Sequence, residues 1–157
     1  MTIAAPAALQ GPFSGGMRPP APEMVQRLSP LALAYIGDAV WECETRTRLL
    51  WPPSKVDTLH GQVQQLVCAE GQQRLLERLI KGFGLSEDEL DWVRRGRNAS
   101  GRGPRRLDPK TYRASTSFET LVGVCACAAS ELQKPLVDAA VLSACMGRSL
   151  GVRSVPH

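Results

Sequence analysis

Residues 30–50 read PLALAYIGDAVWECETRTRLL, and this stretch decides the fold. Its first half is apolar on nearly every side, which is typical of a helix at the centre of a small protein. Ser29 is a suitable N-cap and Pro30 fits the first helical position, so the sequence predicts that the helix begins here. The pattern ends before Trp51-Pro52-Pro53, where the prolines cannot continue a helix.

A second helical pattern of apolar residues begins near Ser54 and stops at Gly82 or Gly84. Gly61 and Gly71 lie inside it, and glycine weakens a helix interior. The sequence therefore leaves open whether this segment is one helix or two.

Further helices are predicted in the second half of the chain. Ser86, followed three residues later by Glu89, resembles a capping box and predicts a short helix through Leu90 and Val93. Residues 98–109 (NASGRGPRRLDP) have the glycine and proline content of a loop. Two more helices are predicted for residues 117–132 and 135–146. No stretch alternates convincingly with period two, so the predicted fold class is all-α.

The length of the chain indicates one domain. A chain of 157 residues with 43% hydrophobic residues can bury one core, but it is too short for a second folded domain. Residues 1–22 are rich in Ala, Pro and Gly and are predicted to be a flexible tail. We expect the domain to span residues 23–150, with a short tail over residues 151–157.

The cysteines and histidines argue against several classes of site. The five cysteines lack CxxC spacing and mostly lie in apolar helical patterns, so we expect buried thiols and no zinc site. With His60 and His157 as the only histidines, a Ser-His or Cys-His hydrolase is disfavoured. No apolar run is long enough to cross a bilayer and no secretion signal is evident, which makes a cytoplasmic protein without a membrane partner the expectation. The cysteines are Cys43, Cys68, Cys125, Cys127 and Cys145.

A basic segment lies between Trp92 and Arg113, with eight basic residues against the single acid Asp108. Seven of the eight are arginines, whose forked donors suit phosphate oxygens, and the glycines let a backbone approach a polyanion. The alternative is a loop whose charges only keep it solvated. The candidate polyanion-binding residues are Arg94, Arg95, Arg97, Asn98, Arg102, Arg105, Arg106, Lys110 and Arg113.

Asp38 is a carboxylate inside the apolar run of the first helix. Burying its charge costs several kcal/mol unless it is paired or bound to a cation. Gly37 leaves space beside it, and Glu42 projects on the same face one turn later. The alternative is an aspartate paired with an arginine of a neighbouring helix.

Glu119 is a second acid where a core helix would prefer leucine, between Phe118 and the apolar run 121–124. As a first-turn residue it would simply favour the positive end of its helix. Together with Asp38 and the basic segment it is more specific, because metal-assisted hydrolysis of a phosphodiester needs oxygen ligands and positive charge to hold the strand.

The motif LAYIGDAV (33–40) resembles the signature helix of the ribonuclease III family. RRGRNA (94–99), TYRASTSFE (111–119) and FETLVG (118–123) are similar to the corresponding blocks of Mini-ribonuclease III. In this order and spacing the blocks cover residues 29 to 147. The resemblance therefore implies an all-helical, dimer-forming endonuclease domain of the ribonuclease III type.

What the resemblance implies is a Mg²⁺-dependent endoribonuclease that cleaves double-stranded RNA as a homodimer without a separate RNA-binding domain. It further implies maturation of 23S ribosomal RNA precursor ends, with a ribosomal protein as an open question. Within such a dimer, the apolar surface of the signature helix, including Tyr35 and Trp41, is the expected interface. The alternative function is a non-catalytic RNA- or ribosome-binding helical module of the same fold.

Asp38 and Glu119 match the signature aspartate and the second-block glutamate, so the resemblance makes them catalytic residues and metal ligands. Full-length ribonuclease III has two more acids, at the positions that Ala34 and Thr116 occupy here. Without these two acids the metal has few carboxylate ligands, and we expect Glu42 or water to take their place. Thr116 offers only a neutral oxygen.

Overall fold

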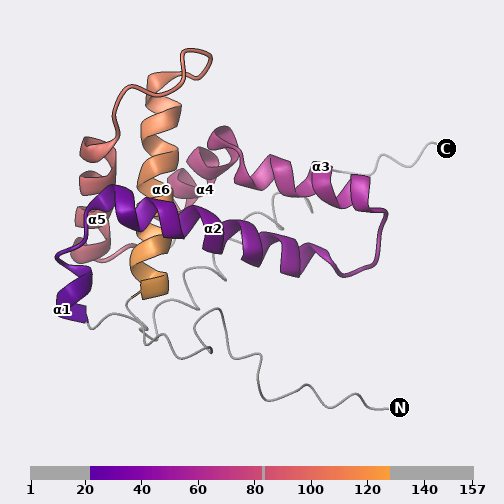
Figure 1. The fold of residues 1–157 in the computed structure, drawn as a ribbon, viewed down its shortest axis with the longest axis horizontal. Helices are drawn as coiled ribbons and strands as arrows, with labels where there is room; N and C mark the ends of the chain where they lie inside the picture. Colours follow the sequence, from indigo (N-terminus) through magenta and orange to yellow (C-terminus); the bar gives the residue numbers. More distant parts are fainter. Residues whose placement is uncertain (1–21, 83, 128–157) are drawn as a thin grey trace.

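The computed structural model describes residues 22–82 and 84–127, which form six helices and no strand (Figure 1). The prediction of an all-α fold is confirmed. The last five residues of the helix predicted for residues 117–132 and the whole helix predicted for residues 135–146 lie outside the described residues, as do Cys145, His157 and nearly all of both predicted tails. The helices are α1 (Pro22–Val25), α2 (Pro30–Leu49), α3 (Val56–Val67), α4 (Ala69–Gly82), α5 (Glu87–Ala99) and α6 (Pro109–Cys127).

Helix α6 is the centre of the packing. It contacts α2, α4 and α5, while α3 lies along α2 and continues into α4. Helix α2 begins as predicted, because the Ser29 hydroxyl accepts a hydrogen bond from the backbone N–H of Ala32 at 3.1 Å and Pro30 occupies the first turn. Helices α2 and α6 cross at a steep angle in Figure 1, which brings the middle of each against the other.

The second helical pattern is two helices, α3 and α4, joined at Cys68. Cys68 has an extended backbone (φ −69°, ψ 158°), which ends α3 before α4 starts at Ala69. Gly71 is needed at this corner, because a Cβ there would lie 3.0 Å from the carbonyl oxygen of Leu66 and closer still to that of Gln65. Gly71, which weakened the predicted helix, therefore lies at the bend between α3 and α4.

Helix α5 begins with the predicted capping box and is longer than predicted. The Ser86 hydroxyl accepts from the N–H of Glu89 at 3.3 Å, and the Glu89 carboxylate accepts from the N–H of Ser86 at 2.7 Å. The helix continues to Ala99, so Asn98 belongs to its last turn. The prediction of a loop from residue 98 was wrong at this end, and the loop covers residues 100–108.

Helix α6 begins at Pro109 and not at Ser117, so the predicted start was also wrong. Asp108 caps it, because its carboxylate accepts from the backbone N–H of Thr111 at 2.9 Å. The polar first turns looked like loop, yet their hydroxyl groups are satisfied inside the helix: the Ser117 hydroxyl donates to the carbonyl of Arg113 at 2.8 Å. Polar residues can therefore line a buried helix here.

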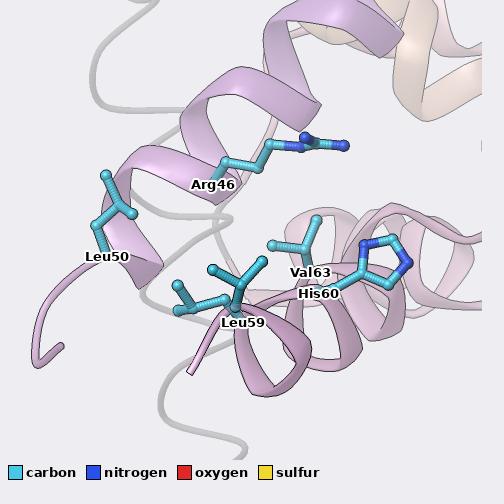
Figure 2. A pocket seen from close by; sticks show the side chains of 6 residues that line it. Arg46, Leu50, Leu59, His60 and Val63 are labelled. Carbon is cyan, nitrogen blue, oxygen red and sulfur yellow. The ribbon is translucent and has the colours of Figure 1, made fainter. Parts of the chain in front are cut away.

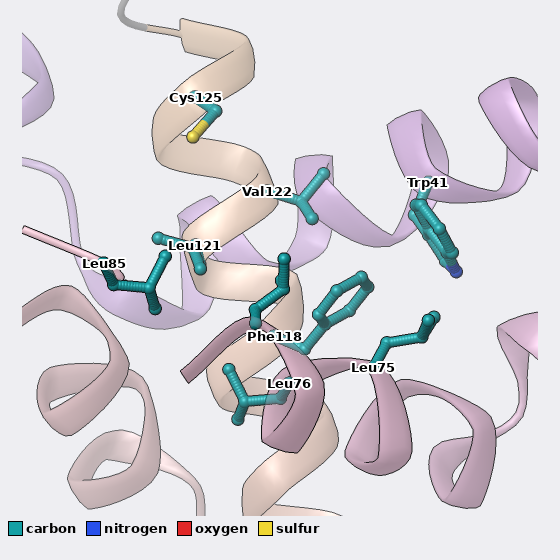
Figure 3. Close-up of a cluster of buried hydrophobic side chains, with 9 residues drawn as sticks. Trp41, Leu75, Leu76, Leu85, Phe118, Leu121, Val122 and Cys125 are labelled. Atoms are coloured by element: carbon teal, nitrogen blue, oxygen red, sulfur yellow. The ribbon is translucent and has the colours of Figure 1, made fainter. Parts of the chain in front are cut away.

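The main hydrophobic core lies where α2, α4 and α6 meet (Figure 3). Trp41 and Phe118 are fully buried and pack edge to face with ring centroids 5.0 Å apart. The Trp41 indole N–H donates to the carbonyl of Leu66 at 3.1 Å. Trp41 is therefore a core residue, and its predicted place in an exposed interface was wrong. Tyr35, in contrast, is 84% exposed.

The four described cysteines are all free thiols, but they differ in burial. Cys125 and Cys127 are buried as predicted, and burial raises the pKa of both thiols, to about 12 for Cys125. Cys43 is exposed, which contradicts the expectation of buried thiols, because it lies on the outer face of α2. Within the described ranges, no helix has both the length and the apolar character needed to span a membrane.

Candidate active site

The site begins at the crossing of α2 and α6, where two glycines let the backbones touch. A Cβ on Gly37 would overlap the carbonyl oxygen of Glu119 and lie 2.7 Å from the backbone nitrogen of Gly123. A Cβ on Gly123 would overlap the carbonyl oxygen of Leu33. Because backbone atoms cannot move aside as a side chain does, both positions require glycine. The close crossing places Asp38, the neighbour of Gly37, beside Glu119.

The charge of Asp38 acts on Glu119, as expected for two carboxylates that lie near each other. Burial and the charge of Asp38 raise the pKa of Glu119 from its ordinary 4.5 to about 7. Burial and the charge of Glu42 raise the pKa of Asp38. A paired arginine would have the opposite effect on the pKa of an acid. Because the pKa of both acids is raised, a structural salt bridge at either carboxylate is disfavoured. A bound cation would relieve the repulsion between the carboxylates.

The position of Glu119 also excludes one alternative. Helix α6 starts at Pro109, so Glu119 lies near the middle of the helix and not in its first turn. Stabilisation by the positive end of the helix acts only within the first turn. The carboxylate is therefore not explained by its helix end.

A third side chain, Gln72 of α4, completes the polar cluster, and the sequence did not single it out. Gln72 is only 1% exposed, and its amide lowers the pKa of both Asp38 and Glu119. Its Nε2 nevertheless has no hydrogen-bond partner of normal geometry among the described residues. The amide N–H is therefore an unused donor close to both carboxylates. The sequence feature that could have indicated Gln72 is a polar residue one turn before the apolar Leu75 and Leu76.

Glu42 and Thr116, the weaker ligand candidates, are engaged within their own helices. The Glu42 carboxylate accepts from the Arg46 guanidinium, although its charge still reaches Asp38. The Thr116 hydroxyl donates to the carbonyl of Tyr112 at 3.1 Å. Within the described ranges, no three His, Cys, Asp or Glu side chains gather closely enough to hold a metal by themselves.

The basic segment divides into a helical part and a loop part. On α5, Arg94 pairs with Asp91 at 3.2 Å and the Arg95 guanidinium stacks 3.7 Å from the centre of the Trp92 ring. Arg97 and Asn98 are exposed at the end of that helix. The exposed basic residues of the loop and of the start of α6 are Arg102, Arg105, Arg106, Lys110 and Arg113.

The basic loop leads into the start of α6 (Figure 1), before Pro109. The ten residues from Pro109 to Glu119 correspond to about 15 Å of helix. Gly103 packs against the ring of Tyr112, where a Cβ would come 2.7 Å from a ring carbon, and this contact holds the loop on α6. One extended ligand could therefore contact both the loop and the carboxylates.

A pocket of about 240 Å³ lies elsewhere, between the end of α2 and the start of α3 (Figure 2). It is lined mostly by apolar side chains such as Leu50, Leu59 and Val63, with Arg46 and His60 at its edge. Arg46 is eight residues beyond Asp38, about 12 Å along the helix. The pocket is not part of the carboxylate site.

Comparison with known proteins gives the family of the chain. The Ribonuclease III domain family matches residues 31–129, which contain Asp38, Gln72, Glu119 and the basic segment. Mini-ribonuclease 3 of Gloeobacter violaceus is 51% identical over 102 residues, covering 65% of this chain and 74% of its own length. Mini-ribonuclease 3 of Synechocystis is 41% identical over 111 residues, covering 71% of this chain and 76% of its own.

The fold is also similar to a solved structure. A crystal structure of a protein from Fusobacterium nucleatum matches with a TM-score of 0.66 and 26% identity, over 76% of this chain and 96% of the other. The family match covers more than half of the chain, and the relatives are matched over most of their length. The chain therefore belongs to the ribonuclease III family, among the Mini-ribonuclease 3 proteins, and is an endoribonuclease.

Proposed function

We propose that Asp38 and Glu119 together bind Mg²⁺ and that the protein uses this site to cleave double-stranded RNA. The observation that supports the proposal is the convergence of two carboxylates from separate helices, with the pKa of both raised by burial and by like charge. Two such acids repel each other without a cation. A divalent ion between them would remove that cost.

The donor set fits Mg²⁺ in particular. This ion keeps several waters and is commonly bound by one or two carboxylates together with phosphate oxygens of the substrate. Two carboxylates of the chain are therefore sufficient, and Glu42 is a further ligand only if it leaves Arg46. Once bound, the ion supplies the positive charge that hydrolysis of a phosphodiester requires.

The chain's own residues bind and orient the RNA. Arg102, Arg105 and Arg106 contact backbone phosphates, while Lys110 and Arg113 extend the same charge along α6 towards Glu119. Such contacts position a duplex without reading its sequence. On α5, Arg97 and Asn98 are the exposed candidates, because Arg94 and Arg95 already have partners in the helix.

We further propose a cytoplasmic homodimer that matures the ends of 23S ribosomal RNA precursors, with a ribosomal protein as a possible assistant in substrate selection. Two strands need two centres, and a two-fold protein is the simplest match to the pseudo-two-fold of a duplex. Tyr35, exposed on α2 beside the site, is the candidate interface residue. The carboxylate pair favours this catalytic function over a non-catalytic RNA-binding module.

The test is an incubation of the wild-type protein with an end-labelled RNA duplex, with Mg²⁺ or with EDTA. We expect discrete products with Mg²⁺ and none with EDTA. Binding without cleavage under both conditions would establish the non-catalytic module instead. A single-stranded RNA of the same sequence is the matched substrate control, and it should stay intact.

A further inference from the structure

We infer that Gln72 is a positioning residue that holds Asp38 and Glu119 in place for the cation, an inference that rests on the proposed metal site. Gln72 belongs to neither of the two helices that carry the carboxylates. Its amide is a third component of the site, and it touches neither the reacting atoms nor the ion.

The first observation is that Gln72 is on the buried face of α4. It precedes Leu75, Leu76 and Leu79 by three, four and seven residues, so all four side chains share one face of the helix. The three leucines pack in the core with Phe118 of α6. Leu75 also shares this cluster with Trp41 of α2, and Asp38 is one turn before Trp41 while Glu119 directly follows Phe118. Gln72, one turn before Leu75, therefore lies in the neighbourhood of both carboxylates.

The second observation is an unsatisfied donor. Gln72 is 1% exposed and its Nε2 has no hydrogen-bond partner among the described residues, an arrangement that destabilises a folded protein. Side chains with such a cost are expected where they serve a site. The nearby groups that this amide influences are Asp38 and Glu119, which can only accept when they are ionised.

The chemistry of an amide suits this position. An amide N–H is able to donate to a carboxylate without adding a charge, so it favours the ionised form of the acid and does not compete with a cation as lysine or arginine would. Asp38 has the greater need, because it is the more exposed of the two carboxylates. An inward donor therefore keeps Asp38 facing Glu119 before the ion binds.

The test is the replacement Gln72→Met, which keeps the length and volume of the side chain but removes the amide. Two properties are measured: the rise in Tm of the protein on titration with Mg²⁺, without RNA, and the Mg²⁺ concentration that gives half-maximal duplex cleavage. We expect the metal-free Tm to be kept or raised, and both Mg²⁺ titrations to need several-fold more ion.

The matched control is Thr45→Val. Thr45 is also 1% exposed, and its hydroxyl also lacks a hydrogen-bond partner in the described part of the chain, but it lies two turns beyond Asp38 on α2. This variant should change the Tm without changing either Mg²⁺ titration. Any general effect of removing a buried polar atom is thereby separated from an effect on the site.

Each outcome decides the inference. If Gln72→Met responds to Mg²⁺ as the wild type does, Gln72 is only a core residue and the inference is wrong. If Gln72→Met does not fold, Gln72→Asn, which retracts the amide by one methylene, must show the same need for more Mg²⁺. If the wild type itself shows neither a Mg²⁺-dependent Tm nor cleavage, the proposed function fails first.

Discussion

Gly37 and Glu119 meet backbone to backbone at the crossing of α2 and α6, and a Cβ on Gly37 would overlap the carbonyl oxygen of Glu119. The same contact that packs the two helices brings Asp38 to the Glu119 side chain. The distance between the carboxylates is therefore set by a glycine, and the site depends on how closely the helices approach.

Gly37→Ala should destabilise the protein by about 1–3 kcal/mol or more, because the added methyl group meets backbone atoms of Glu119 and Gly123 that cannot move independently. Gly61→Ala is the matched control, since nothing lies within 4 Å of a Cβ there and Gly61 is inside α3. It should stabilise by about 0.5–1 kcal/mol. Urea denaturation of the two variants measures both effects, and equal behaviour would contradict the close crossing.

Without metal, Glu119 should destabilise the folded protein as the pH rises. Its pKa is raised from 4.5 to about 7, so between these values the folded state binds more protons than the unfolded state and stability falls. Glu119→Gln removes this contribution. The variant should gain stability over the wild type progressively from pH 4.5 to 7, by on the order of 1–2 kcal/mol after screening by solvent. Thermal unfolding in EDTA at a series of pH values measures the difference in stability between Glu119→Gln and the wild type. If Glu119 instead had a stabilising partner, the variant would be the less stable of the two.

Replacing Arg102, Arg105 and Arg106 together with alanine should weaken duplex binding and flatten its salt dependence. Each lost phosphate contact removes about one unit of log-log slope. The cleavage rate at saturating RNA should be spared, because the loop precedes α6 and Glu119 is about 15 Å along that helix. Lys81→Ala, an exposed lysine at the end of α4, is the single-charge control. An unchanged affinity and slope would make the basic segment a solvated face.

Light scattering should give twice the chain mass of 17.0 kDa at micromolar concentration. Tyr35→Asp should lower that mass, since a charge placed in a buried interface is costly. A mass of one chain for the wild type would contradict the dimer. A dimer that persists in Tyr35→Asp would move the interface elsewhere, for example to the exposed Leu50, Trp51 and Val56.

Most features that could be predicted from the sequence are local patterns of a few residues. The Ser29 cap, the box of Ser86 and Glu89, and the two acids in apolar runs are all visible within a few residues. Trp41 was misplaced because its helix is apolar on nearly all sides, and only tertiary packing decides which aromatic ring faces the core. The start of α6 was missed because buried serine and threonine hydroxyl groups are satisfied by their own helix.

The third component of the site could not be predicted in the same way. Gln72 is an ordinary residue for a helix, and its meaning depends on α4 packing beside the crossing of α2 and α6. The partners Asp38 and Glu119 are 34 residues before it and 47 after it in the chain. No local pattern relates positions so far apart. The sequence shows only that a glutamine interrupts a leucine-rich helix face.

The most direct test of the central claim is the cleavage of an RNA duplex by Asp38→Asn in Mg²⁺. The amide keeps the shape of the side chain and removes the charge that holds the cation. We expect a folded protein that still binds the duplex with nearly wild-type affinity but makes no product, and Glu119→Gln should behave likewise. Cleavage by Asp38→Asn at close to the wild-type rate would make Asp38 a structural residue and contradict the proposed metal site.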